Sequence, residues 1–343
     1  MAISLAIKYR PTSWDDVTEQ SSTRVILQQQ LATKTFKHAY LFCGPAGCGK
    51  TTCARIFAND INHSQGNPIE LDAASNNGVD DVRDIIQQSK TQSLDSEYKI
   101  FIIDECHALS NSAWQAMLKI IEEPPAKSIF IFCTTDPQKI PKTIISRVQR
   151  YDFQRISQES IVDRLEHIFF LECGYGSPNT RDALEYIAKL ADGGMRDAIT
   201  MLDKCLSYST DLTLDNVVTA LGIVPYDTMM NLTKSIMGRN SLEVIKTIDT
   251  IHNSGKDLKQ FCKQYMEFLL EVTKYGVGCS WNLIQLPKLS KLVDWVENDA
   301  DFELCLKLLD VFVKLNSEIK YSGTVKNDVE ATLLLAMYSG DNK

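Results

Sequence analysis

The sequence predicts an α/β domain followed by two helical domains, and three observations support this fold class. Before about residue 153, short apolar runs alternate with helical patterns, which is typical of a parallel sheet covered by helices on both faces. A glycine-rich stretch follows the first apolar run and opens a helical pattern. After residue 156 the strand-like runs disappear, and apolar residues recur with the period of an α-helix.

Turn-forming residues indicate where the later elements end. Gly222 and Pro225 mark a second domain boundary, and the turn-rich residues 275–280 mark a break between helices. The expected strands are residues 39–43, 69–71, 99–103 and 128–133, with an edge strand after residue 147. The expected helices start after residue 50 and cover residues 79–88, 111–123, 160–170, 181–191 and 195–206. The expected domains are residues 1–156, 157–222 and 223–343.

Length and composition exclude several classes of protein. A chain of 343 residues is too long for one ordinary core. Its composition, 44% hydrophobic and 23% charged, is that of globular proteins, and no apolar run reaches the ~20 residues of a membrane span. The opening MAISLAIKYRP lacks a secretory signal pattern, so we expect a cytoplasmic protein that has no membrane partner. A net charge of −8 argues against nucleic-acid binding over the whole surface but allows a local basic site.

The ten cysteines contain no CxxC pair. Reduced and mostly buried thiols are therefore expected, rather than disulfides or a zinc site.

The stretch GPAGCGKT fits the phosphate-binding pattern G-x-x-x-x-G-K-[ST]. Its glycines allow backbone N–H groups to surround phosphate oxygens, and the helix N-terminus adds positive potential. Lys50 can reach the terminal phosphates and Thr51 can hold Mg²⁺, so ATP and Mg²⁺ are the expected cofactors. The residues expected to contact the nucleotide are Gly44, Pro45, Ala46, Gly47, Cys48, Gly49, Lys50, Thr51 and Thr52.

The stretch KIFIIDECH places two carboxylates at the end of a predicted strand. Asp104 can bind magnesium through water, and Glu105 can orient and deprotonate the attacking water. Carboxylates after a strand are often only solvated, but a position downstream of a P-loop favours hydrolysis. His107 is expected to be a packed or hydrogen-bonded histidine rather than a catalyst.

Further polar residues could reach the same nucleotide. Thr134 and Thr135 end a strand expected beside the P-loop strand, so a hydroxyl there senses the γ-phosphate, holds the attacking water or only caps the strand. Arg196 begins a helix in the second domain and either reaches the nucleotide or stays exposed.

A set of motifs carries a resemblance to a known family. In chain order they are KYRP, GPAGCGKT, ELDAASNNGVDDVRD, IIDECH, ML-KIIEEPP, CTTDPQKIP, SRVQRYDF and GGMRDA. This order resembles the bacterial DNA polymerase III gamma/tau subunit, the ATPase of the replication clamp loader, over essentially the whole chain. The resemblance implies an AAA+ P-loop domain, a small helical lid and a helical collar that assembles five subunits. It also implies three partners: a sliding clamp, primed DNA and other clamp-loader subunits.

The resemblance also assigns residue roles. Arg147, which has no acidic neighbour in sequence, takes the place of the arginine finger that clamp loaders extend to the ATP of a neighbouring subunit. An interfacial salt bridge without catalysis is the alternative. Thr135 would be sensor 1 and Arg196 sensor 2, while Tyr9 and Arg10 would border the adenine.

The chain departs from the family pattern in three ways. Val148 replaces a cysteine after the finger position, and this apolar residue is expected to pack. The stretch FANDINHSQGNP stands where the family carries a four-cysteine zinc module, so no zinc is expected. We also expect a short form without the tau tail that binds the helicase and polymerase.

A DNA contact is expected at the stretch SNNGVDDVRD. Asn76 and Asn77 precede a predicted helix whose N–H groups, together with Arg83, could face a phosphate. An ordinary Asn-Gly turn and helix cap is the alternative.

Three other functions compete with this interpretation. A DExH-type helicase shares the P-loop and DECH but needs a second α/β domain, which the helical pattern after residue 157 disfavours. A protein unfoldase would need an aromatic-hydrophobic-glycine pore loop, which is not found. A non-catalytic clamp-loader scaffold is disfavoured by intact Lys50, Asp104 and Glu105.

Overall fold

The computed structural model describes residues 3–177, 179–284, 286 and 290–338. The chain forms two compact units, which divide between Leu206 and Ser207. The elements that begin in the first unit are α1 (Leu5–Lys8), α2 (Ser21–Thr33), β1 (Ala39–Cys43), α3 (Lys50–Ile61), β2 (Ile69–Asp72), α4 (Val79–Ser89), β3 (Lys99–Asp104), α5 (Asn111–Glu122), β4 (Ser128–Thr134), α6 (Lys142–Ile145), β5 (Gln149–Asp152), α7 (Gln158–Cys173), α8 (Thr180–Leu190) and α9 (Met195–Tyr208). Those of the second unit are α10 (Leu214–Leu221), α11 (Tyr226–Met237), α12 (Ser241–Asn253), α13 (Leu258–Gly276), α14 (Ser290–Asn298), α15 (Phe302–Glu318) and α16 (Val325–Tyr338).

The first unit is built on a five-stranded parallel sheet with strand order β2-β3-β4-β1-β5. The register pairs Cys43 with Thr134 and Asp72 with Asp104, so the carboxyl ends of the strands meet at one edge. In open α/β sheets this edge is where ligands bind. The edge strand expected after Arg147 is confirmed as β5, which pairs with β1.

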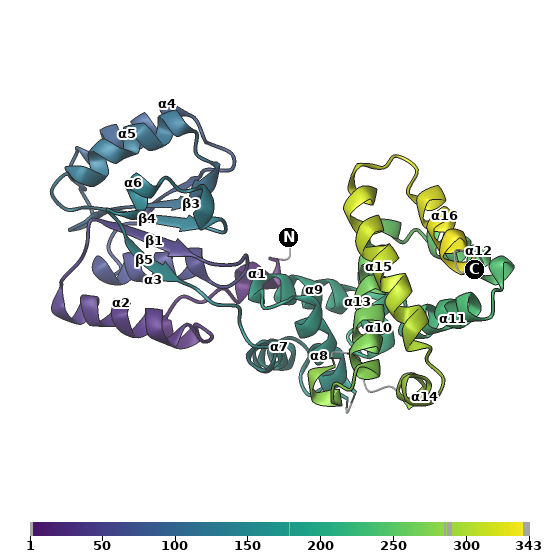
Figure 1. Cartoon of the computed structure of the whole chain (residues 1–343). Helices are drawn as coiled ribbons and strands as arrows, with labels where there is room; N and C mark the ends of the chain where they lie inside the picture. The colour runs from purple at the N-terminus through teal and green to yellow at the C-terminus, as the bar shows by residue number, and fades with distance from the viewer. Residues whose placement is uncertain (1–2, 178, 285, 287–289, 339–343) are drawn as a thin grey trace. The chain divides into compact units, whose positions relative to one another are not determined.

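Helices cover both faces of the sheet, as Figure 1 shows, with α2 and α3 on one face and α4, α5 and α6 on the other. Phe42 of β1 packs in the same core as Phe57 of α3. Leu41, its neighbour in β1, points to the opposite core with Trp114 of α5. Burial on both faces explains why the strands read as continuous apolar runs.

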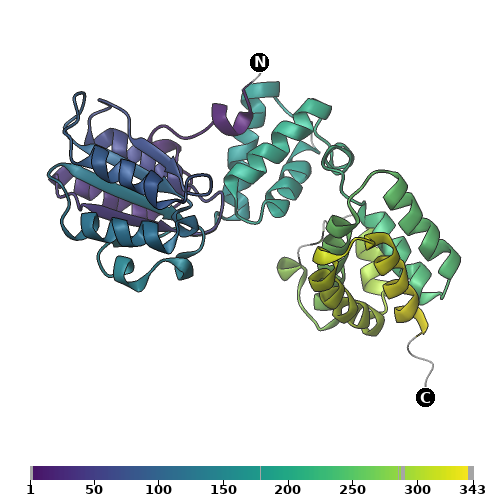
Figure 2. The same ribbon diagram turned by 90° about the horizontal axis from the view of Figure 1, so that it is seen from above.

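Helices α7, α8 and α9 complete the first unit, and the N-terminal helix α1 lies beside them in both views (Figures 1 and 2). The N–H of Leu5 donates to Oδ2 of Asp203 in α9 at 3.0 Å. Lys8 forms an ion pair with Glu172 of α7 at 2.6 Å. The segment that leads into the sheet is therefore fastened to helices that come much later in the chain.

Glu19 and Gln20, which immediately precede α2, bond to the P-loop and to the segment around the start of α7. The side-chain amide of Gln20 donates to the carbonyl of Gln154 at 2.7 Å and accepts from its N–H at 3.1 Å. Glu19 accepts from the hydroxyl of Ser160 in α7 at 2.7 Å. Both residues have left-handed backbone conformations, with φ of 57° and 56°.

The second unit is helical in all its described elements and has one apolar core. Tyr265 of α13 stacks edge-on against Phe312 of α15, with ring centroids 4.9 Å apart, and its hydroxyl meets Thr233 at 2.9 Å. Gly222 ends α10 with a φ of 73°, as the sequence predicts for this boundary. The compact units divide earlier, at residue 206, so the division into three domains stays a prediction.

The structure bears on three expectations from the sequence: the state of the cysteines, a zinc site and membrane-spanning helices. All ten cysteines are free thiols and eight are buried, with Cys173 exposed and Cys279 half-buried, as expected. No described residues form a group of three or more potential metal ligands, and the lack of zinc stays a prediction. In the described part of the chain, no helix combines the length and apolar character needed to cross a bilayer.

Candidate nucleotide-binding site

The P-loop connects β1 to α3, as the sequence predicts. Gly47 and Gly49 have φ values of +72° and +101°, where a residue with a Cβ atom would be strained. Helix α3 begins at Lys50, so the N–H groups of its first turn have no partner within the helix and face the loop. The local backbone is therefore a cradle for phosphate.

The P-loop touches the start of α9 directly. A Cβ added at Gly47 would lie 2.9 Å from Cα of Gly194, so the two backbones approach more closely than side chains allow. The N–H of Met195 also donates to the carbonyl of Gly47 at 3.1 Å. The P-loop and the helix that carries Arg196 are therefore in direct backbone contact.

A cavity of about 410 Å³ opens beside the P-loop within the first unit. Its size is that of a small-molecule site, for which ~300–1,000 Å³ is usual. The expected residues that line it are Tyr9, Arg10, Ala46, Gly47, Cys48, Gly49, Lys50, Thr51, Thr52, Asp104, Glu105 and Arg196. The expected residues outside this lining are Gly44, Pro45, Thr135 and Arg147.

Lys50 and Thr51 make polar contacts at the P-loop and at the end of β3. The amine of Lys50 is held at the loop by the carbonyls of Gly44 and Pro45, at 2.9 and 2.7 Å. Oγ1 of Thr51 donates to Oδ2 of Asp104 at 2.8 Å. A hydroxyl beside a carboxylate is an all-oxygen donor set, so Thr51 and Asp104 fit Mg²⁺.

Glu105 lines the cavity just beyond β3, with a left-handed φ of 46°. Its Oε2 accepts from the hydroxyl of Thr135 at 3.0 Å and lies 3.3 Å from Nδ1 of His107. The same nitrogen is 3.2 Å from Oγ1 of Thr134. Thr135 therefore reaches the site through the carboxylate of Glu105 and is not part of the cavity wall.

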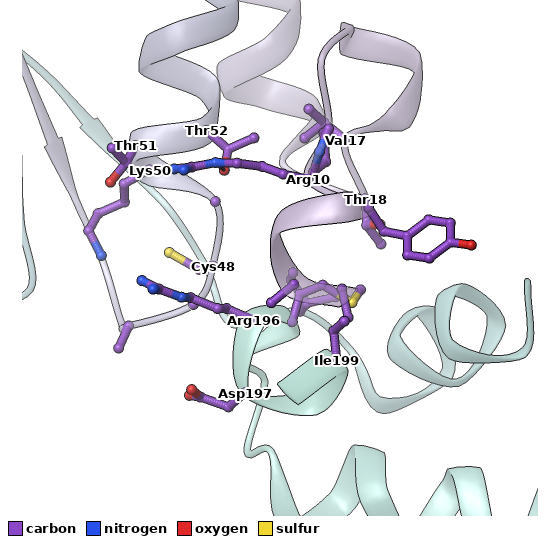
Figure 3. Close-up of a pocket in the computed structure, with 18 of the residues that line it drawn as sticks. Arg10, Val17, Thr18, Cys48, Lys50, Thr51, Thr52, Arg196, Asp197 and Ile199 are labelled. Carbon is purple, nitrogen blue, oxygen red and sulfur yellow. Dashed lines mark hydrogen bonds between the residues drawn. The ribbon is translucent and has the colours of Figure 1, made fainter. Parts of the chain in front are cut away.

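Arginine side chains add positive charge to the cavity. Figure 3 shows Arg196 extending from α9 toward the P-loop and Arg10 extending toward Thr52, to which its Nε donates at 3.3 Å. Burial, followed by the nearby charge of Arg55, lowers the pKa of Arg10. Lys50 and Arg164 line the same cavity, so four cationic side chains stand in its wall, a pattern suited to a polyphosphate.

Comparisons with known proteins identify the family. The chain is 35% identical to the DNA polymerase III subunit tau of Bacillus subtilis over 92% of its own length and 59% of that protein. It is 31% identical to the DNA polymerase III subunit gamma of Buchnera aphidicola subsp. Schizaphis graminum over 97% of each chain. This chain belongs to the DNA polymerase III gamma/tau family. The chain thus spans almost all of the Buchnera gamma subunit but little more than half of the Bacillus tau subunit.

Two further matches concern one segment of the chain and its fold. Residues 67–157 match a family described as DNA polymerase III, delta subunit. A solved structure of the Thermotoga maritima RuvB Holliday junction branch migration motor superposes with a TM-score of 0.53 at 18% identity, over 67% of this chain and 79% of that one. The fold is therefore AAA+, as expected, and fold and family together support an ATPase that uses a nucleotide with Mg²⁺.

In this gamma/tau chain Arg147 has a partner that the sequence did not reveal. Its guanidinium forms an ion pair with Glu122, the last residue of α5, at 2.8 Å, and donates to the carbonyl of Thr143 at 2.8 Å. The side chains of Arg147 and Glu122 are 39% and 42% exposed. Val148 next to it packs against the apolar core, as expected.

The predicted DNA-contact residues gather at the start of α4. Asn76 bonds back to the carbonyl of Asp72, and the carbonyl of Asn77 accepts from Ser110 at 3.1 Å. Arg83 pairs with Asp80 at 2.7 Å, and both side chains are largely exposed. The helix cap is present, because the N–H of Gly78 donates to Oδ2 of Asp81 at 3.0 Å, whereas the turn lies earlier, at residues 73–75. The phosphate contact stays a prediction.

Proposed function

We propose that this chain is the ATP-hydrolysing subunit of a clamp loader, which opens a sliding DNA clamp and places it at primer-template junctions during replication. One observation carries the proposal: a single cavity gathers Lys50, the Asp104–Glu105 pair and Arg196 in a member of the gamma/tau family. Each of these groups suits a different part of a bound nucleoside triphosphate.

The P-loop and helix α3 would bind the nucleotide. The N–H groups of the loop would surround the phosphates, and Lys50 would exchange its loop carbonyls for the terminal phosphate oxygens. Thr51 and Asp104 would hold Mg²⁺, which when bound neutralises phosphate charge. Arg10 and Tyr9 line the same cavity and would border the rest of the nucleotide.

Glu105 would act as the general base for hydrolysis. Its carboxylate would take the proton of the attacking water while the water oxygen bonds to the γ-phosphorus, and the bond to the ADP oxygen breaks. Thr135, which donates to this carboxylate, would act as sensor 1. Arg196 would act as sensor 2, because α9 touches the P-loop and can report the state of the nucleotide.

Arg147 would complete the site of a neighbouring subunit. It lies outside the cavity of its own chain and pairs with Glu122 on an exposed surface, which leaves it accessible to another molecule. The proposed partners are the sliding clamp, primed DNA and further clamp-loader subunits in a ring of five. Because the chain spans 59% of the Bacillus relative, any contacts made by the rest of that protein lie beyond this proposal.

The test is ATP hydrolysis by the assembled complex with and without its sliding clamp and primed DNA. We expect slow ATP turnover in the complex alone and faster turnover when the clamp and primed DNA are added, because a clamp loader hydrolyses ATP when it places the clamp on DNA. Equal rates would remove the clamp-loader proposal.

The second arm of the test is Glu105→Gln. The amide keeps the shape of the side chain but cannot take a proton, so ATP binding should persist while hydrolysis falls by ~10²-fold or more. Glu97→Gln, which changes a surface carboxylate paired with Lys127, is the matched control and should keep the wild-type rate. Loss of ATP binding in Glu105→Gln would mean that the base is misassigned.

A further inference from the structure

Gln20 makes a contact with the P-loop that the proposed function does not use. The residue is buried, with 8% of its surface exposed, and it lies outside the lining of the nucleotide cavity. Its side-chain amide nitrogen donates to the carbonyl of Cys48 at 3.4 Å. Cys48 and the next residue, Gly49, both line the cavity. The amide therefore reaches the P-loop from outside the nucleotide cavity.

The position of this amide is fixed by the segment that follows β5. Its nitrogen donates to the carbonyl of Gln154 at 2.7 Å, and its oxygen accepts from the N–H of the same residue at 3.1 Å. A glutamine amide carries two N–H donors, so one serves Gln154 and the other is left for Cys48. Because two bonds to one backbone orient the plane of the amide, the direction of the second N–H is set as well.

The backbone of Gln20 gives a second indication that contacts determine its placement. Gln20 has a φ of 56° and follows Glu19, whose φ is 57°. Two successive residues with side chains in the left-handed region are uncommon. Such conformations persist where the surrounding structure over-determines them, and they gather at functional sites.

A carbonyl held from outside the cavity directs the N–H of the same peptide unit toward it. In a trans peptide the C=O and N–H lie in one plane and point in opposite directions. The carbonyl of Cys48 and the N–H of Gly49 belong to one such unit. The preceding unit is also held by its carbonyl, because Gly47 accepts from the N–H of Met195 at 3.1 Å. Two successive peptide units of the P-loop are thus oriented by donors from other segments.

We propose that Gln20 is a positioning residue for nucleotide binding, whose amide holds the carbonyl of Cys48 so that the N–H of Gly49 faces the phosphates. This inference rests on the proposed role of the P-loop in binding ATP. It adds a residue outside the phosphate-binding motif, on the segment before α2, that acts on the nucleotide only through the backbone of the loop.

The experiment measures the affinity of the full chain for fluorescent analogues of ATP and ADP in Gln20→Met and Gln20→Asn. Methionine has about the length of glutamine but no N–H for Cys48. Asparagine keeps an amide and suits a left-handed backbone, but it is shorter by a methylene group and cannot span the same partners. Hydrogen bonds to charged groups are among the stronger ones, so misdirecting one N–H should weaken binding of both nucleotides by about tenfold.

The loss should appear in binding and not in turnover. An N–H of the phosphate cradle serves bound ATP and the transition state alike. KM should therefore rise, while kcat of the assembled complex with clamp and primed DNA should stay within about twofold of wild type at saturating ATP. A residue that acted only on the general stability of the fold would not produce this division.

Gln30→Met and Gln30→Asn are the matched controls. Gln30 is also 8% exposed and its amide is also hydrogen-bonded, but its partners include Tyr40, near the start of β1, and Tyr151 of β5. These variants should melt at a lower temperature than wild type and keep its nucleotide affinity. If they weaken binding as much as the Gln20 variants do at an equal melting temperature, loss of stability explains the effect and the inference fails.

The remaining outcomes separate this inference from the proposed function. If Gln20→Met does not fold, Gln20→Asn carries the test, because asparagine is compatible with the backbone at this position. Wild-type affinity in the folded Gln20 variants, or a fall in kcat without a change in affinity, would overturn the inference. If Lys50→Ala loses ATP binding while the Gln20 variants keep it, the inference fails and the proposed function stands. If the wild-type chain binds neither nucleotide, the proposed function itself fails.

Discussion

Glu19 shows how one carboxylate can join two parts of the first unit. Burial alone would raise the pKa of Glu19, but hydrogen bonds from Ser157 and Ser160 at the start of α7 outweigh it, and its pKa lies below the ordinary value. A depressed pKa in the folded state adds stability above the unfolded-state value of ~4.3. This contribution is lost as the pH falls through the folded-state pKa.

Glu19→Gln should therefore destabilise the protein at pH 7. The loss of charged hydrogen bonds at a helix N-terminus should cost about 1 kcal/mol, or ~2 to 4 °C for a unit of this size. The gap to wild type should narrow as the pH falls below the unfolded-state value of ~4.3, and it should close only below the depressed folded-state pKa, where the carboxylate is protonated in both states. Thermal melting against pH measures this. Glu159→Gln, an exposed residue in the first turn of the same helix, is the control and should show a smaller gap.

Individual site residues were predictable where their chemistry is contiguous in sequence. Lys50, Thr51 and Asp104 lie in short motifs whose spacing forces them to the same sheet edge. The partners Glu122 and Gln20 were not predictable, because each meets its target only after the chain has folded. His107 was expected to be packed or hydrogen-bonded, but nothing in the sequence pointed to the hydroxyl of Thr134 as its partner.

Among the elements, the strands and the helices after the P-loop follow the sequence patterns closely, whereas α2 was missed. Its three buried side chains are Thr23, Leu27 and Gln30, while Val25 and Ile26 are exposed. The buried face is thus mostly polar. Buried Gln30 is stabilised by a hydrogen bond, because the hydroxyl of Tyr40 donates to its Oε1 at 2.8 Å. A hydrophobic period cannot reveal a helix that packs through hydrogen bonds.

Helix α4 carries the prediction for DNA. Arg83→Ala should weaken primed-DNA binding of the assembled loader about equally for all sequences and lower the slope of log K against log salt by about one. The pair with Asp80 is exposed and worth at most ~1 kcal/mol, so a phosphate can displace the carboxylate. Asp80→Asn removes this competitor and should strengthen binding. An unaltered affinity and slope in Arg83→Ala would leave the segment as a capped turn.

For the whole molecule, the cavity lies entirely within the first unit, and Arg147 lies outside its lining. A guanidinium that stays paired with Glu122 cannot stabilise charge in its own site. The arrangement is consistent with action on a neighbour, the role that the resemblance implies for Arg147, and that role stays a prediction. This makes the finger the part of the proposed mechanism that most needs a test with more than one chain.

Arg147→Ala should leave the nucleotide affinity of the chain nearly intact and lower hydrolysis in the assembled complex by ~10²-fold or more. Lys50→Ala should fail for a different reason, because it loses the phosphate contact but keeps the finger. Mixed assemblies of the two would place some intact nucleotide sites beside intact fingers, so activity should partly return. Formation of mixed assemblies is checked first by size. If they form and stay as inactive as either parent, while Arg147→Ala alone fails to bind ATP, the arginine serves its own subunit.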